Sequence, residues 1–161
     1  KHECICFHMT DLPFGRGGSP LQNLIIRNIK KTKLSAFRMT NELDAGPIYL
    51  KETLDLKGSA GEIYTRATQQ SLKMISKIIK ENLSPKKQTG KPVYFKRRNE
   101  DESQITDFSS LNKLYNFIRM LDADGYPNAF IETQKIRFKF YDAKLNYRKL
   151  SAKVDIEIKK K

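Results

Sequence analysis

The chain has 161 residues, of which 39% are hydrophobic and 30% charged, with a formal net charge of +13. This length and apolar fraction suit one packed domain plus a small second unit, and they exclude a wholly disordered chain. No apolar run approaches the roughly 18 to 20 residues of a membrane span, and no secretion signal stands at the N-terminus. We therefore expect a cytoplasmic protein that makes no membrane contact.

The first 83 residues alternate between strand and helix signals. The apolar run 4–7 predicts a buried strand, and the prolines and glycines of residues 8–18 predict an irregular loop after it. Ser19 followed by Pro20 predicts the capped start of a helix. Further along the chain, the pattern predicts strands at 34–40 and 48–56, and a long helix that begins with a capping box of Ser59 and Glu62.

The rest of the chain divides into a basic segment and a small second unit. Residues 84–106 predict a linker or a strap over the surface, because Pro85, Gly90 and Pro92 interrupt any regular element. Residues 107–161 predict a helix and then three strands, at 128–133, 136–141 and 151–158. We therefore expect three parts, with boundaries at residues 1–83, 84–106 and 107–161.

Positive charge gathers late in the chain. Residues 84–98 hold six basic and no acidic residues, and residues 135–161 hold ten basic and three acidic residues. Tyr94, Phe95 and Tyr141 interleave with these cations, which favours a phosphate backbone or a nucleotide as partner. A solvated, solubilising surface explains the same charges, so both readings stay open.

Cysteine and histidine are too few to predict a metal centre. The only cysteines are Cys4 and Cys6, two residues apart in a predicted strand, which is poor geometry for a disulfide. Without further cysteines or clustered histidines we expect no zinc or other metal site.

Two segments carry a family resemblance. Residues 8–13 (HMTDLP) with 16–20 (RGGSP) downstream, and residues 42–48 (ELDAGPI), resemble the two signature segments of the folate-dependent formyltransferase superfamily. The superfamily includes methionyl-tRNA formyltransferases and sugar N-formyltransferases. The resemblance implies an α/β fold, with a partial open sheet of Rossmann type followed by a small α+β or reduced OB-like C-terminal domain. It also implies that residues 1–83 correspond to the second half of the catalytic domain.

The resemblance implies a catalytic site around His8 and Asp44. His8 matches the family's histidine and Asp44 its aspartate, whereas the asparagine expected two residues before the histidine falls on Cys6. A thiol is a weak hydrogen-bond donor, so Cys6 is a poor replacement for an amide. Substrate or cofactor contacts are expected from the loop and the helix start that follow, where backbone N–H groups can hold an anion. These residues are Thr10, Asp11, Arg16, Gly17 and Gly18.

The function implied by the resemblance is formyl transfer from 10-formyltetrahydrofolate, as co-substrate, to a primary amine. The reduced second unit slightly favours a nucleotide-linked amino sugar as acceptor, while the basic segments favour methionyl-tRNA. A non-catalytic formyltransferase-like module that binds nucleotides or nucleic acid is the alternative, supported by Cys6 and by the missing first half of the domain. The oligomeric state does not follow from the sequence.

Overall fold

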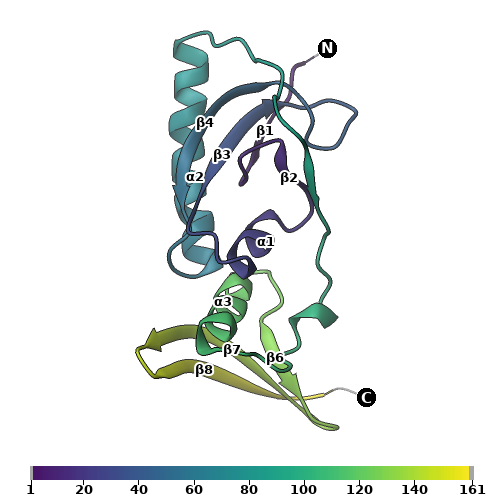
Figure 1. Ribbon diagram of the computed structural model, residues 1–161, viewed down its shortest axis with the longest axis vertical. Helices are drawn as coiled ribbons and strands as arrows, with labels where there is room; N and C mark the ends of the chain where they lie inside the picture. Colours follow the sequence, from purple (N-terminus) through teal and green to yellow (C-terminus); the bar gives the residue numbers. More distant parts are fainter. Residues whose placement is uncertain (1, 160–161) are drawn as a thin grey trace.

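The computed structural model describes residues 2–159, which form an elongated molecule with the two ends of the chain far apart (Figure 1). Pairs of strands are followed by a short and then a long helix in the first half, and a helix with a three-stranded sheet ends the chain. In chain order the elements are β1 Ile5–His8, β2 Phe14–Gly17, α1 Pro20–Ile26, β3 Lys31–Arg38, β4 Ile48–Asp55, α2 Ala60–Lys80, β5 Val93–Phe95, the 3₁₀ turn η1 Asp101–Ser103, α3 Leu111–Leu121, β6 Ala129–Glu132, β7 Ile136–Asn146 and β8 Lys149–Ile158.

The first sheet has the order β1-β3-β4, and all of its pairings are antiparallel. β3 begins three residues earlier than the sequence pattern indicates, because residues 31–33 pair with residues 53–55 of β4. β1 is less buried than predicted: Ile5 is 37% exposed, since β3 is the one described strand that pairs with β1. Among the described residues, no further strand extends the sheet at either edge, and Ile48 on the β4 edge exchanges two backbone hydrogen bonds with Lys86.

Helix α2 covers one face of this sheet (Figure 1). The predicted capping box is confirmed: Ser59 Oγ accepts from the Glu62 backbone N–H at 3.3 Å, and Glu62 Oε2 accepts from the Ser59 N–H at 2.8 Å. These two bonds satisfy two donors that a helix start otherwise leaves unpaired. The buried side chains of α2 recur at the helical period and are Ala60, Ile63, Ala67, Met74 and Ile78.

The loop and the basic strap, both expected to lack regular structure, instead form a two-stranded ribbon. β2 and β5 pair in parallel, and the pairing is bounded by a bond from Val93 N to Pro13 O at 3.1 Å and one from Gly18 N to Phe95 O at 3.0 Å. Gly17 permits this approach: its φ is +101°, and a Cβ there would lie 2.5 Å from the Phe95 carbonyl oxygen. The prediction that residues 8–18 are wholly irregular was wrong, because residues 14–17 form β2. Pairing between segments so far apart in sequence leaves no local signal.

Ser19 does not cap α1, in contrast to the expectation. Its φ is +46° and its side chain makes no capping bond. Instead, Ser19 Oγ accepts from the Arg98 backbone N–H at 3.0 Å, so the hydroxyl anchors the strap to the start of α1.

The C-terminal sheet has the order β6-β7-β8, and α3 packs on β7. It is open, with no closed barrel among the described residues, so the α+β form of the prediction applies. α3 begins at residue 111, after Ser110 accepts from the Lys113 N–H at 3.3 Å. β7 and β8 are longer than predicted, because their pairing resumes beyond a bulge at residues 142–143.

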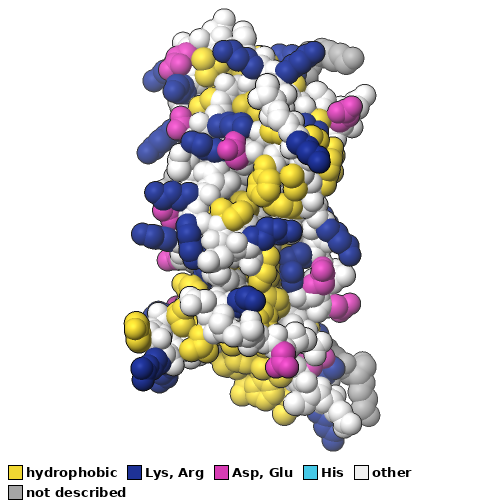
Figure 2. Space-filling model, viewed as in Figure 1, with side chains coloured by type: hydrophobic (Ala, Val, Ile, Leu, Met, Phe, Trp, Pro, Cys, Tyr) yellow, Lys and Arg dark blue, Asp and Glu magenta, His cyan; other side chains and the backbone are white. Residues whose placement is uncertain are grey.

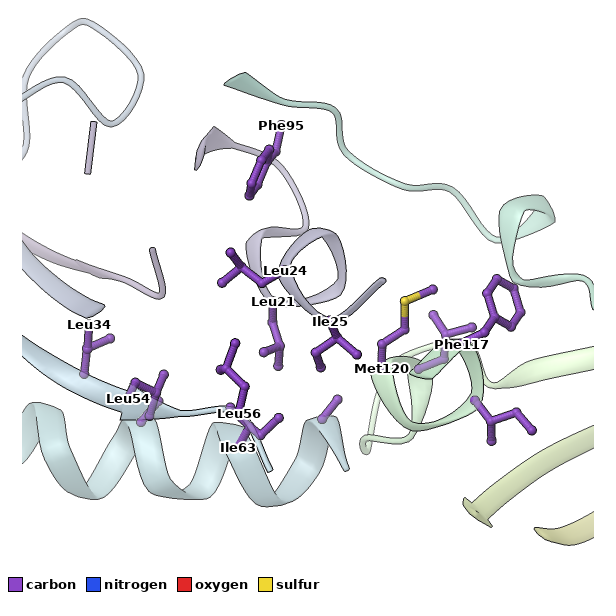
Figure 3. Close-up of a cluster of buried hydrophobic side chains, with 14 of the residues drawn as sticks. Leu21, Leu24, Ile25, Leu34, Leu54, Leu56, Ile63, Phe95, Phe117 and Met120 are labelled. Atoms are coloured by element: carbon purple, nitrogen blue, oxygen red, sulfur yellow. The ribbon is translucent and has the colours of Figure 1, made fainter. Parts of the chain in front are cut away.

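One hydrophobic core joins the two sheets. Leu21, Leu24 and Ile25 of α1 lie between the α2-covered sheet and α3, and Phe117 and Met120 of α3 belong to the same buried cluster (Figure 3). A buried amide stabilises the same junction, because Gln22 Nε2 donates to Tyr64 Oη at 3.0 Å and to Met120 O at 3.1 Å. The boundaries proposed after residues 83 and 106 stay predictions. Within residues 2–159, no helix is both long and apolar enough to cross a bilayer.

Candidate active site

His8 ends β1 with its ring buried and one nitrogen fixed. Its Nε2 lies 2.7 Å from Gly15 O, which also accepts from Thr10 Oγ1 at 3.3 Å. A carbonyl oxygen only accepts, so in the neutral ring Nε2 carries the proton. Nδ1 is then the nitrogen that can take up a proton, and it faces Asp44 Oδ2 across 3.8 Å.

Asp44 is held beside His8 by the turn between β3 and β4. Its backbone has φ +49°, and its Oδ2 accepts from the Gly17 N–H at 2.8 Å. The two signature segments therefore meet in space at the pair His8 and Asp44, as the resemblance implies. A carboxylate fixed in this way can orient the imidazole and balance a proton on Nδ1.

The two glycine N–H groups are not available to an anionic ligand, in contrast to the expectation. The Gly17 amide is bonded to Asp44, and the Gly18 amide is bonded to Phe95 O at 3.0 Å. Gly18 also lies against the strap, since a Cβ there would be 2.4 Å from Arg97 Cβ. The structure gives both glycines a role in close backbone packing.

Arg16 is engaged within the protein by Gln88, a strap residue that the sequence pattern does not single out. Gln88 Oε1 accepts from Arg16 Nε at 3.2 Å and from Nη2 at 2.7 Å. Gln88 Nε2 donates to Asp44 O and Gly46 O, each at 2.8 Å. One carboxamide thus ties Arg16 on the first signature segment to the backbone of the second. The sequence offers no signal for it beyond its place in the basic strap.

Thr10 and Asp11 are both engaged within the protein, so their expected ligand contacts stay predictions. Thr10 is fully buried, and its carbonyl accepts from Ser35 Oγ at 2.7 Å. Asp11 pairs with Lys51 Nζ at 2.6 Å. Both residues brace the loop after β1.

Cys6 shares a cleft of about 220 Å³ with Asp44. Burial, and secondly the negative charge of Asp44, raise the pKa of the Cys6 thiol. The thiol is therefore protonated at neutral pH and is not an activated nucleophile. The remaining residues that line the cleft are Phe37, Met39, Thr40, Asn41, Glu42 and Leu43.

In residues 2–159, no group of three or more His, Cys, Asp or Glu side chains is placed to hold a metal ion.

Comparison with known proteins relates the chain to formyltransferases. Residues 100–157 match the family model described as methionyl-tRNA formyltransferase, C-terminal domain. The methionyl-tRNA formyltransferase of Clostridium botulinum is 29% identical over 159 residues, which cover 95% of this chain and 51% of that protein. The chain thus spans about half the length of the curated relatives that it matches.

Solved structures extend the similarity to the fold. A methionyl-tRNA formyltransferase from Clostridium thermocellum is 46% identical, with a TM-score of 0.95 over 99% of this chain and 70% of that chain. A 4-N formyltransferase from Francisella tularensis, 17% identical, aligns with a TM-score of 0.68 over 82% of this chain and 58% of that chain, a likeness of fold. These similarities confirm the predicted α/β formyltransferase fold class.

Proposed function

Because this chain belongs to the formyltransferase family that includes the methionyl-tRNA formyltransferases, we propose that it carries the catalytic histidine and aspartate of an N-formyltransferase. The observation that supports this most is the convergence of His8, Asp44 and the Gly17 amide from two separate signature segments. A buried histidine with one nitrogen fixed by a carbonyl and the other facing a carboxylate is an arrangement suited to proton transfer.

The co-substrate, 10-formyltetrahydrofolate, supplies an activated formyl group. The acceptor nitrogen bonds to the formyl carbon while the bond from that carbon to N10 of the folate breaks. Overall, the amine loses one proton and N10 gains one. His8 Nδ1 can take this proton from the acceptor amine and pass it to N10 of the folate. Asp44 keeps the imidazole ring oriented during the transfer. The cleft beside Cys6 and Asp44 has room for the formyl group and the amine.

We propose methionyl-tRNA as the acceptor. The slight preference for a nucleotide-linked amino sugar, drawn from the small second unit, is not supported: the 46% identical structure is a methionyl-tRNA formyltransferase, while the sugar-enzyme likeness is one of fold. Charge supports the same choice. The strap carries the exposed cations Lys86, Lys87, Lys91, Lys96 and Arg97, and none of them forms a salt bridge with the described residues.

Among the described residues, several cations of the C-terminal segment are neutralised by neighbours. Arg137 pairs with Glu100 and Glu132, Lys139 pairs with Glu157, and Lys153 pairs with Asp142. Paired charges attract a phosphate backbone less than unpaired ones do. We therefore propose that the strap, rather than the C-terminal sheet, contributes the main tRNA contacts of this chain.

The experiment is formyl transfer by the full-length gene product, with methionyl-tRNA and nucleotide-linked amino sugars offered as acceptors. We expect turnover with methionyl-tRNA, and we expect His8→Ala and Asp44→Ala each to lower kcat by about 10²-fold to 10⁴-fold. His2→Ala and Asp107→Ala are matched controls, since both residues are exposed and lie outside the site, and each should leave kcat close to that of the unmodified enzyme.

A non-catalytic binding module is the second candidate, and Cys6 is the observation that favours it. With a thiol at the position of the family's asparagine, the site lacks one strong donor for the developing oxyanion. A folded protein that binds tRNA but turns over none of the acceptors would establish this reading and exclude the enzyme.

A further inference from the structure

The neutral ring of His8 has one proton, and the protein rather than water determines which ring nitrogen carries it. His8 is 8% exposed, and no histidine shows among the described side chains on the face drawn in Figure 2. Gly15 O lies 2.7 Å from Nε2, whereas Asp44 Oδ2 lies 3.8 Å from Nδ1, beyond hydrogen-bonding range.

The two oxygens compete for this proton. A carboxylate is the stronger acceptor, because it carries a full negative charge, but the carbonyl of Gly15 lies 1.1 Å closer to its nitrogen than the carboxylate of Asp44 does. The nitrogen that keeps the proton is the one with the shorter hydrogen bond only while the carbonyl stays in place. The position of the Gly15 carbonyl therefore determines which nitrogen is free.

Ser35 supports this carbonyl from the strand beside His8. It lies directly opposite His8 in the pairing of β1 with β3, and it is fully buried. Side chains of directly opposed residues stand on the same face of a sheet, with Cβ atoms about 5 Å apart. Ser35 Oγ donates to Thr10 O at 2.7 Å. The hydroxyl thereby ties the loop after β1 to the strand that faces the histidine.

Thr10 connects that contact to the Gly15 carbonyl itself. Its Oγ1 donates to Gly15 O at 3.3 Å, and a carbonyl oxygen has two lone pairs, so it can also accept from His8. Close packing restricts the carbonyl further. Gly15 has φ +78°, and a Cβ there would lie 2.6 Å from Thr10 Cγ2 and 2.8 Å from the Phe95 ring. Buried hydroxyls and tight packing thus fix the oxygen that holds the Nε2 proton.

We propose that Ser35 and Thr10 are positioning residues, which hold the Gly15 carbonyl against His8 Nε2 and so keep Nδ1 free to accept a proton. This role rests on the proposed function, in which Nδ1 takes the proton of the acceptor amine. Without either hydroxyl the carbonyl moves away from Nε2, and Asp44 draws the proton to Nδ1. A neutral ring protonated at Nδ1 cannot accept a second proton there, so proton transfer slows while substrate binding does not change.

The test is the tautomer of His8, measured from the NMR chemical shifts of its two ring nitrogens in the full-length gene product. Protonated and unprotonated imidazole nitrogens have well separated shifts, and the signals of His8 are those lost in His8→Ala. At a pH where the ring is neutral, Nε2 should carry the proton in the unmodified protein. Thr10→Val and Ser35→Ala should each move the proton, wholly or in part, to Nδ1.

Thr10→Ser is the matched control for Thr10→Val. Serine keeps the hydroxyl and loses the methyl group, whereas valine keeps the shape and loses the hydroxyl, so Thr10→Ser should leave the proton on Nε2. Ser103→Ala, which removes a buried hydroxyl from η1, should leave it there too. In steady-state kinetics, Thr10→Val and Ser35→Ala should lower kcat by about tenfold or more with KM nearly unchanged.

The nitrogen shifts do not depend on turnover, so they separate this proposal from the proposed function. A proton that stays on Nε2 in both Thr10→Val and Ser35→Ala would overturn the positioning role, even in an active enzyme. So would a proton on Nδ1 in the unmodified protein, or an equal displacement in Thr10→Ser. The expected tautomers in a protein that transfers no formyl group would refute the proposed function and support the positioning role.

Discussion

Gln88 is the residue on which the geometry of the candidate site most depends outside His8 and Asp44. Its carboxamide makes four contacts, two from Arg16 and two to the carbonyls of residues 44 and 46. Hydrogen bonds to a charged group contribute about 1.5 to 3 kcal/mol each, and small displacements of a catalytic group are costly. Gln88 therefore acts as a positioning residue for the turn that presents Asp44.

We expect Gln88→Leu to lower kcat/KM for formyl transfer by about tenfold to a hundredfold, or about 1.4 to 2.8 kcal/mol of transition-state stabilisation. Gln88→Glu should be comparably impaired, since a carboxylate can accept from Arg16 but cannot donate to the two carbonyls. Thr89→Ala, at the exposed neighbour, is the control. Equal activity in all three variants would show that the turn positions Asp44 without a contribution from Gln88.

Cys6 is a second residue whose effect is measurable. Asparagine at this position would place an amide donor in the cleft that Cys6 shares with Asp44. We expect Cys6→Asn to raise kcat by about tenfold or more, since one donor to an oxyanion is commonly worth at least that much. Steady-state kinetics with methionyl-tRNA measure this; a fall in kcat would mean that another group already fills the donor's place.

Helix α3 is the element that binds the second sheet to the first part of the molecule, and Arg119 is its strongest polar contact. The guanidinium is 4% exposed, and its Nη1 donates to Leu56 O and Gly58 O, each at 2.8 Å. Burial lowers the pKa of Arg119, and its described neighbours offer carbonyl and amide oxygens in place of a carboxylate. These bonds offset the cost of burying the charge.

Arg119→Met should lower the free energy of unfolding by about 2 to 4 kcal/mol, because it leaves two buried carbonyls without a donor. Chemical denaturation of the full-length gene product measures the change. Lys113→Met, on the exposed side of the same helix, should change stability by less than about 0.5 kcal/mol. Similar losses from both substitutions would mean that the helix, and not these bonds, determines the effect.

At the scale of the whole molecule, the basic residues behind the net charge of +13 are of two kinds. Some form salt bridges with carboxylates, and others form none with the described residues. We expect neutralisation of Lys86, Lys87 and Lys91 on the strap to weaken tRNA binding and to reduce the slope of log K against log salt by about two to three units. Binding titrations over a salt series give this slope. Neutralisation of Lys139 and Lys153, which are ion-paired in the C-terminal sheet, is the control and should leave the slope nearly unchanged.

Local signals were sufficient for much of the fold. The capping box and apolar stripe of α2, the alternation of strands and helices, and the three strands at the end of the chain are all properties of short windows of sequence. Each depends on contacts between residues a few positions apart, which periodicity and capping chemistry predict directly. The two signature segments could also be recognised from the sequence, because the residues of each segment lie close together in the chain.

The sequence alone thus determined the α/β class, the main elements and His8 with Asp44 as the candidate pair. The tertiary structure decided the pairing of β2 with β5, the anchoring of the strap by Ser19, the bridge made by Gln88, and which cations are neutralised. The strand pairing, the Ser19 anchor and the contact of Gln88 with Arg16 join residues more than 70 positions apart, and the contacts of Gln88 with residues 44 and 46 join residues more than 40 positions apart. No local pattern encodes such contacts, because they depend on where packing brings each backbone segment.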